Sequence, residues 1–152
     1  MRVLIDNNLT IALAESVTCG LATHQLNVVK GTSDILMGSV ICYNEAVKSQ
    51  VLRVKPSLIN KYTAESVEVT EALAKNLRKV FKANVYAAIT GLASSGASES
   101  KHKPVGTVFF AVVYKRKVYS EKRVFQGSTL QIKKKAVEHL YKFITGVVKR
   151  RK

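Results

Sequence analysis

The fold of this chain is decided by the stretch Ala12-Leu13-Ala14-Glu15-Ser16-Val17-Thr18-Cys19-Gly20. The run from Thr10 to Ala14 is apolar and predicts a buried strand, and the helical spacing from Thr18 onward predicts a helix to about Val29. The turn between them places the Ser16 hydroxyl beside unpaired N–H groups and the positive end of a helix dipole. Such donors suit a phosphate or a developing oxyanion, although most serines at such turns only cap a helix.

The composition is that of one globular domain, which we expect to span residues 1–152. Apolar residues make up 47% of the 152 positions and charged residues 23%, as in ordinary globular proteins. The sequence has neither an apolar run long enough for a membrane span nor a signal-peptide layout, so we expect a cytoplasmic protein that binds no membrane. The two cysteines are then expected to be free thiols. The three histidines are scattered, so the sequence predicts neither a metal site nor a cofactor.

The chain is strongly basic. Lysine and arginine number 25 against 10 acidic residues, a formal charge of +15. Such a field attracts nucleic acid, anionic lipid or anionic small molecules. The lysines are spread over several elements without interleaved aromatic residues, which favours a solvated surface. Nucleic-acid binding stays a weaker alternative.

The order of the predicted elements is β-α-β-α-α-β-β-β-α when the two short helical pieces between residues 44 and 62 are counted together. It predicts an α/β fold, namely a three-layer α/β/α sandwich with a mixed, mostly parallel sheet and a C-terminal β-hairpin followed by a helix. Gly38, inside the second strand, indicates a bulge or a close approach of the backbone. The elements after the first strand and helix are expected at 35–43, 44–52, 57–62, 67–82, 84–90, 104–114, 118–125 and 129–148.

Three predicted loops leave the carboxyl ends of strands. They are Glu15–Cys19, Tyr43–Lys48 and Gly91–Ser98. Sites in open α/β sheets lie at the carboxyl ends of parallel strands. If the three strands are parallel neighbours, the three loops converge on one crevice.

Six motifs in these loops and around them resemble the C-terminal domain of the CinA proteins, which also occurs alone as nicotinamide-nucleotide amidohydrolase. The family's Ala-Glu-Ser-Cys-Thr-Gly-Gly corresponds to 14–20, and its Gly-Ser-Ser to Gly31-Thr32-Ser33. Its Tyr-x-Asn-Glu-x-Lys corresponds to 43–48 and its Thr-Gly-x-Ala to 90–93. Lys-Pro-Val-Gly-Thr-Val is intact at 103–108, and Phe-x-Gly stands at 125–127. The motifs occur in the family's order.

The resemblance implies hydrolysis of the carboxamide of nicotinamide mononucleotide to nicotinic acid mononucleotide and ammonia, a step of pyridine-nucleotide salvage in NAD metabolism. It implies Ser16 as nucleophile, Lys48 as general base, and Tyr43 as an aid to proton transfer or geometry. A lysine can act as a base only if its surroundings lower its pKa from about 10.4. We expect the dipole of a short helix that begins near Lys48 to contribute to this.

The resemblance also implies the residues that bind the substrate. Thr18 and the N–H groups around Cys19 and Gly20 are expected to form an oxyanion or phosphate cradle, and Gly91 to Ser94 the opposite side of the nucleotide. Glu15 either orients Lys48 or Tyr43 or satisfies backbone donors in its own turn. The implied set is Glu15, Thr18, Cys19, Gly20, Thr32, Ser33, Gly91, Ala93 and Ser94.

Several positions depart from the family pattern. Cys19 stands at a glycine position, where a positive φ would strain it. The loop usually written Gly-Ile-Ala-Gly-Pro-x-Gly is Gly91 to Ala97 here, and the usual Asp-Arg after Phe-x-Gly is Ser128-Thr129. The departures favour an alternative, a catalytically weak or inactive domain that binds a nucleotide or a protein partner. In either case we expect a small-molecule nucleotide ligand and a homo-oligomer.

Overall fold

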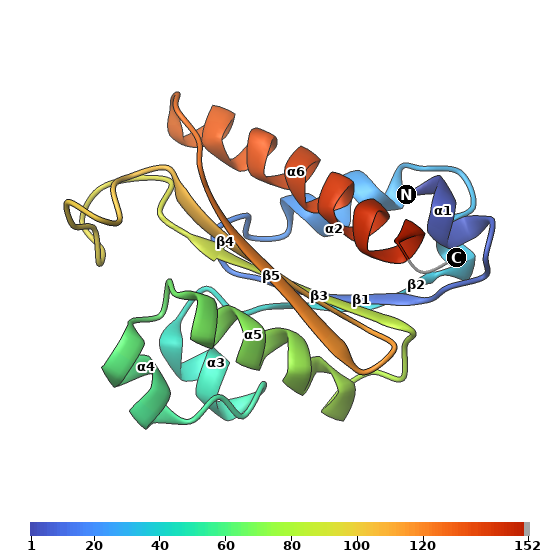
Figure 1. Ribbon diagram of the computed structural model, residues 1–152, viewed down its shortest axis with the longest axis horizontal. Helices are drawn as coiled ribbons and strands as arrows, with labels where there is room; N and C mark the ends of the chain where they lie inside the picture. The colour runs from blue at the N-terminus through green and yellow to red at the C-terminus, as the bar shows by residue number, and fades with distance from the viewer. Residues whose placement is uncertain (151–152) are drawn as a thin grey trace.

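The computed structural model describes residues 1–150, so residues 151 and 152 of the expected domain lie outside the described part. It has the predicted α/β fold, with helices on both faces of a five-stranded sheet (Figure 1). The elements in chain order are α1 (Arg2–Ile5), β1 (Ile11–Glu15), α2 (Leu21–Asn27), η1 (Thr32–Asp34), β2 (Leu36–Ile41), α3 (Glu45–Gln50), α4 (Pro56–Tyr62), α5 (Val67–Asn76), η2 (Leu77–Lys79), β3 (Val85–Gly91), β4 (Thr107–Tyr114), β5 (Lys117–Val124) and α6 (Thr129–Lys149).

The strand order of the sheet is β2-β1-β3-β4-β5. β1 pairs in parallel with both β2 and β3, while β4 is antiparallel to both β3 and β5. Four strands therefore run in one direction and only β4 runs against them. The predicted mixed sheet and its C-terminal hairpin are confirmed. Because β1 lies between two parallel neighbours, the carboxyl ends of β1, β2 and β3 meet at one edge of the sheet.

Each face of the sheet has its own apolar core. Successive strand residues point to opposite faces, so Leu13, Ile89 and Phe110 pack under α2 and α6. Their neighbours Ala14, Ala88 and Ala111 pack under α3, α4 and α5. Figure 1 shows the two helical layers, with α1, α2 and α6 on one side and α3, α4 and α5 on the other. β1 and β4 are buried along their whole lengths, as their apolar runs predicted.

Helix α6 begins with a capping box in which Ser128 and Gln131 satisfy each other's backbone N–H groups. This arrangement pairs two donors that a helix start otherwise leaves without partners. Its predicted inward stripe is buried, and consists of Ile132, Ala136, Leu140, Ile144 and Val147. The cap and the stripe together fix where α6 begins over the sheet.

Helix α5 ends earlier than its periodicity predicted. It passes at Asn76 into the 3-10 turn η2, and the N–H groups of both Val80 and Phe81 donate to the Leu77 carbonyl. A Cβ on Gly38 would lie 2.6 Å from the Phe81 ring, so that ring fills the space that a side chain on Gly38 would need. The pairing register between β1 and β2 also shifts at this point. Gly38 therefore marks both the bulge and the close approach that its place in the strand predicted.

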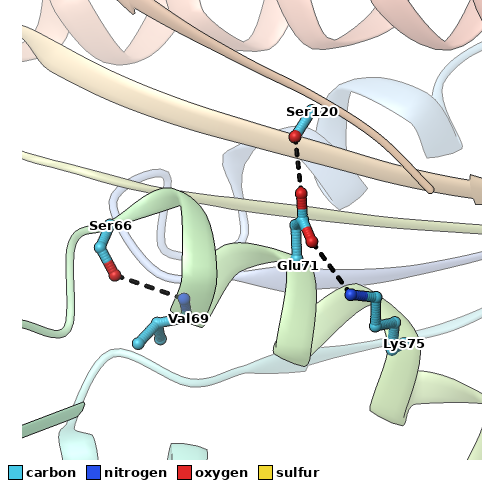
Figure 2. A network of polar contacts seen from close by, with 5 residues as sticks. All are labelled: Ser66, Val69, Glu71, Lys75 and Ser120. Carbon is cyan, nitrogen blue, oxygen red and sulfur yellow. Dashed lines mark hydrogen bonds and ion pairs between the residues drawn. The ribbon is translucent and has the colours of Figure 1, made fainter. Parts of the chain in front are cut away.

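Polar contacts join α5 to the edge strand β5 (Figure 2). The Ser66 hydroxyl accepts a hydrogen bond from the Val69 N–H at 3.3 Å and caps the helix. One oxygen of Glu71 accepts from Lys75, one turn later, at 3.0 Å, and the other accepts from the Ser120 hydroxyl at 2.7 Å. These contacts hold α5 along the sheet, and so they fix the turn before α5 that borders the site. Within residues 1–150 no helix is both long enough and apolar enough to cross a membrane.

Candidate active site

Ser16 leaves β1 at the edge of the sheet where the parallel strands end. Its N–H donates to the Ile89 carbonyl at 3.0 Å, and the Cys42 N–H donates to the Glu15 carbonyl at 2.8 Å. The end of β1 is thus held from both sides by β3 and β2. The Ser16 side chain is 5% exposed. Its hydroxyl is therefore presented from a fixed backbone.

Lys48 reaches the same place from the second loop. Asn44 caps α3 by accepting from the Ala46 N–H at 2.8 Å, and Lys48 follows in that helix. Its ammonium nitrogen lies 3.2 Å from Ser16 Oγ, 2.7 Å from the Cys42 carbonyl and 3.1 Å from the Tyr43 carbonyl. Two carbonyls can accept both hydrogens of a neutral amine, which directs the nitrogen lone pair toward the serine hydroxyl.

Burial sets the charge state of Lys48. The side chain is 1% exposed, and this desolvation lowers the pKa of Lys48, while Cys42, Glu65 and Glu45 oppose the shift. Burial also raises the pKa of the Cys42 thiol to about 11. Desolvation is the main cause of the lowered pKa of Lys48. The expected contribution of a helix dipole is wrong, because Lys48 lies in the last turn of α3 and not at its start.

The three predicted loops converge on one pocket, which encloses about 300 Å³. This volume is at the lower end of the range for small-molecule sites. One wall comes from the end of β1, one from the start of α3, one from the loop after β3, and one from the first turn of α6. The lining residues are Ser16, Val17, Tyr43, Asn44, Glu45, Glu65, Gly91, Leu92, Ala93, Ser94, Ala97, Thr129 and Lys133.

The comparison with known proteins agrees with the arrangement of motifs. The family model for the CinA C-terminal domain matches residues 1–148. This chain belongs to the CinA C-terminal domain family. Its relatives include CinA-like proteins of Petrotoga mobilis, 30% identical over 149 residues, and Fervidobacterium nodosum, 35% identical over 136 residues. The alignments cover 98% and 89% of this chain but 37% and 33% of those relatives. The chain thus spans about a third of the length of the curated relatives it matches.

Solved CinA structures share the fold. A CinA superfamily protein from Enterobacter cloacae superposes with a TM-score of 0.90 at 27% identity, covering 96% of this chain and 86% of that one. Competence damage-inducible protein A from Klebsiella pneumoniae gives a TM-score of 0.93 at 22% identity, covering 99% and 93%. The fold predicted for this CinA-family chain is therefore confirmed.

The carboxylate of Glu15, a predicted substrate-binding residue of this CinA-family chain, is bound within its own turn, and Glu15 is not among the residues that line the pocket. The side chain is fully buried. One carboxylate oxygen accepts from the Thr18 hydroxyl at 2.7 Å and from the N–H groups of Gly20 and Ala22, each at 3.0 Å. The other accepts from the Thr23 N–H at 2.7 Å and from its hydroxyl at 2.5 Å. Of the two roles that the sequence left open, Glu15 therefore satisfies the donors of its own turn.

Three donors of the predicted cradle of Thr18, Cys19 and Gly20 are already used within the turn. The Thr18 hydroxyl and the Gly20 N–H bind Glu15, and the Cys19 N–H donates to the Ser16 carbonyl at 3.1 Å. Cys19 has a φ of 48°, so the strain expected for a cysteine at this glycine position is present and costs about 1 kcal/mol. The left-handed backbone of Cys19 and Gly20 delays the start of α2 to Leu21.

Thr32 and Ser33 lie away from the pocket in this chain, and their prediction as substrate contacts is not met. The Thr32 hydroxyl donates to the carbonyls of Leu26 and Val29, at 2.9 and 2.6 Å, and closes the C-terminal end of α2. The site lies at the opposite end of that helix.

The remaining predicted residues line the pocket. Gly91, Ala93 and Ser94 form the wall opposite α3, and the Tyr43 side chain, 68% exposed, lies at its rim. Within residues 1–150, the contact of Tyr43 with Lys48 is made by its carbonyl and not by its phenol. Sequence reasoning missed Glu65, Thr129 and Lys133. Thr129 and Lys133 could have been found from the sequence, because the Phe-x-Gly motif at 125–127 directly precedes the helix that carries them.

Proposed function

We propose that this protein is an amidase that hydrolyses the carboxamide of nicotinamide mononucleotide to nicotinic acid mononucleotide and ammonia. The observation that carries the proposal is the 3.2 Å separation of Lys48 Nζ and Ser16 Oγ beside a pocket of about 300 Å³. Nucleophile and base within hydrogen-bonding reach are the first requirement of serine-based acyl transfer. Membership of the CinA family and its resemblance to nicotinamide-nucleotide amidohydrolase support the choice of substrate.

In the proposed first step neutral Lys48 removes the proton of the Ser16 hydroxyl as the oxygen attacks the carboxamide carbon. The resulting tetrahedral intermediate carries a negative oxygen. Its C–N bond then breaks, Lys48 returns the proton to the departing nitrogen, and ammonia leaves. A water molecule hydrolyses the Ser16 ester by the same proton route and releases the acid. Overall the amide and one water give the acid and ammonia.

The N–H groups of Val17 and Thr18 are the proposed donors to the negative oxygen. They directly follow Ser16, and in the part of the chain that the structure describes neither has a hydrogen-bond partner. Donors placed where charge develops are a large source of stabilisation in acyl transfer. This assignment moves the predicted oxyanion site toward the serine, since the donors of Cys19 and Gly20 are engaged in the turn.

The phosphate of the nucleotide is proposed to lie at the end of the pocket formed by α6. Thr129, at the start of this 21-residue helix, and Lys133 both line the pocket. The first N–H groups of a helix lack partners within it and lie at its positive end. Thr129 replaces the family's arginine, and Lys133, four residues later on the same face, brings a cation to the same pocket.

We expect Lys133→Gln to raise the KM for nicotinamide mononucleotide about tenfold, because a hydrogen bond to a charged group contributes about 1.5 kcal/mol. The KM for nicotinamide riboside, which has no phosphate, should change little. Steady-state ammonia release with both substrates measures the difference. Lys134→Gln, an exposed neighbour on the same helix, is the matched control. Equal effects of Lys133→Gln on both substrates would exclude a phosphate contact.

The proposed reaction is tested by ammonia release from the wild-type protein. Nicotinamide mononucleotide, nicotinamide riboside and nicotinamide are compared at equal concentration, and the product is identified by chromatography. We expect the mononucleotide to be the best substrate. If none of the three is hydrolysed, the amidase proposal fails, and calorimetric binding of the mononucleotide without turnover would point to the nucleotide-binding alternative.

A further inference from the structure

A side-chain network fastens the loop after β3 to the turn between α4 and α5. The ammonium of Lys103 donates to the Thr63 hydroxyl at 2.6 Å, to the Glu65 carbonyl at 3.1 Å and to the Ser98 hydroxyl at 2.7 Å. The Ser98 hydroxyl in turn donates to the Glu65 carboxylate. Three acceptors match the three hydrogens of an ammonium group. We call Thr63, Glu65, Ser98 and Lys103 the Lys103 latch.

The loop that the latch fastens is organised internally by other groups. The Glu99 carboxylate accepts from the N–H groups of Gly96 and Ala97, at 2.7 and 2.8 Å. Ser100 and Lys103 exchange two backbone hydrogen bonds, both 3.0 Å long. Glu99 thus gives order to the segment that lacks the family's usual glycine and proline. The side chains of the latch then set the position of this loop relative to the turn before α5.

The latch borders the candidate active site through Glu65. This residue lines the pocket together with Ser16 and with Ala97 of the fastened loop. Its carboxylate also acts on the buried base, since the charge of Glu65 opposes the lowering of the pKa of Lys48. The other groups that face Lys48 are Cys42, at the end of β2, and Glu45, at the start of α3. Of Cys42, Glu45 and Glu65, only Glu65 is a member of the Lys103 latch.

We propose that Lys103 is a positioning residue for the amidase: it fixes the pocket wall and holds the Glu65 carboxylate against Ser98, which limits the effect of this charge on the base Lys48. The inference rests on the proposed function for its effect on turnover, whereas the contacts of the latch and the place of Glu65 in the pocket lining are independent of that function. Lys103 touches neither Ser16 nor Lys48 among the contacts of residues 1–150. Its influence on the base passes through Glu65.

Lys103→Met is the test variant. Without the ammonium, the Glu65 charge is uncompensated and raises the pKa of Lys48, so a higher pH is needed to obtain the neutral base. We expect the acidic limb of the kcat/KM profile to move up by about one pH unit, and KM to rise because the pocket wall loosens. Lys103→Arg, which keeps the charge, should restore the position of the limb. Lys101→Met, an exposed lysine of the same loop, should leave the profile unchanged.

The decisive readout does not depend on turnover. The titration of Lys48 is followed by NMR in protein labelled at the lysine ε-carbon, with Lys48→Arg used to assign the signal. We expect Lys103→Met to raise the pKa of Lys48 and Glu65→Gln to lower it. In the Glu65→Gln background, Lys103→Met should have no further effect. This double-mutant cycle separates an effect through Glu65 from a general loosening of the fold.

The outcomes distinguish the two proposals. A pKa of Lys48 that stays within about 0.2 of wild type in Lys103→Met, or a shift that persists in the Glu65→Gln background, overturns the latch. If Lys103→Met does not fold, Glu65→Gln alone decides, because an unchanged pKa of Lys48 would contradict the charge relation. If the NMR shifts occur but the wild type does not hydrolyse nicotinamide mononucleotide, the amidase proposal fails and the latch stands.

Discussion

Lys48→Ala is expected to reduce kcat for nicotinamide mononucleotide by about 10³-fold or more, because loss of a general base removes at least this much in serine-based catalysis. The hydroxyl of Ser16 is a weak nucleophile until its proton is accepted, and Lys48 Nζ is 3.2 Å away. Steady-state ammonia release measures the loss. In the wild type the rate should rise with pH through the pKa of Lys48, which burial brings below its usual range.

Two controls separate this result from a loss of folding. Lys142→Ala removes a lysine that lies outside the pocket lining and should keep full activity. Burial makes the pKa of Lys48 lower in the folded protein than in the unfolded chain, so unfolding takes up a proton. Burying the charged Lys48 therefore destabilises the folded protein fully at pH values below the folded-state pKa of Lys48. This destabilisation decreases as the pH rises toward 10.5. At neutral pH Lys48→Met should be at least as stable as wild type. Undiminished activity of Lys48→Ala would eliminate Lys48 as the base.

Glu15→Gln is expected to lower the free energy of unfolding by about 3–5 kcal/mol, as is typical when a buried charge-assisted network is broken. The carboxylate oxygens accept hydrogen bonds from Thr18, Gly20, Ala22 and Thr23. An amide replaces one acceptor by an NH₂ group, which would then face the N–H donors of the turn. Urea unfolding measures the change through the midpoint and slope.

The exposed Glu138 on α6 provides the matched control, since Glu138→Gln should change the unfolding free energy by less than about 0.5 kcal/mol. Because the same turn carries Ser16, we also expect Glu15→Gln to lose activity under conditions in which it stays folded. A Glu15→Gln variant as stable as Glu138→Gln would mean that the carboxylate does not hold the turn.

The sheet and the meeting of its loops could be predicted from the sequence because they follow from local patterns. Apolar runs such as that of β4 and the spaced stripe of α6 are visible within single segments. The pairing of β1 with parallel neighbours on both sides then requires that the loops meet at one edge. The proximity of Ser16 and Lys48 follows from that topology and from the motif positions.

The roles of several site residues could not be predicted, because they depend on long-range packing. A carboxylate beside a turn can point toward the base or toward the backbone, and only the completed start of α2 shows that Glu15 points to the backbone. Lys103 contacts Thr63, forty residues away in the sequence, only when both loops are folded. The sequence did not distinguish Lys133 from the other lysines of this basic chain, because its place in the pocket lining depends on the position of α6.

The measurement that tests the central claim most directly is ammonia release from nicotinamide mononucleotide by wild type, Ser16→Ala and Cys42→Ser in parallel. Removal of the Ser16 hydroxyl leaves the pocket and Lys48 in place but takes away the attacking oxygen. We predict that the wild type and Cys42→Ser release ammonia and nicotinic acid mononucleotide, while Ser16→Ala falls by about 10³-fold or more. Equal turnover by Ser16→Ala and wild type would contradict the account.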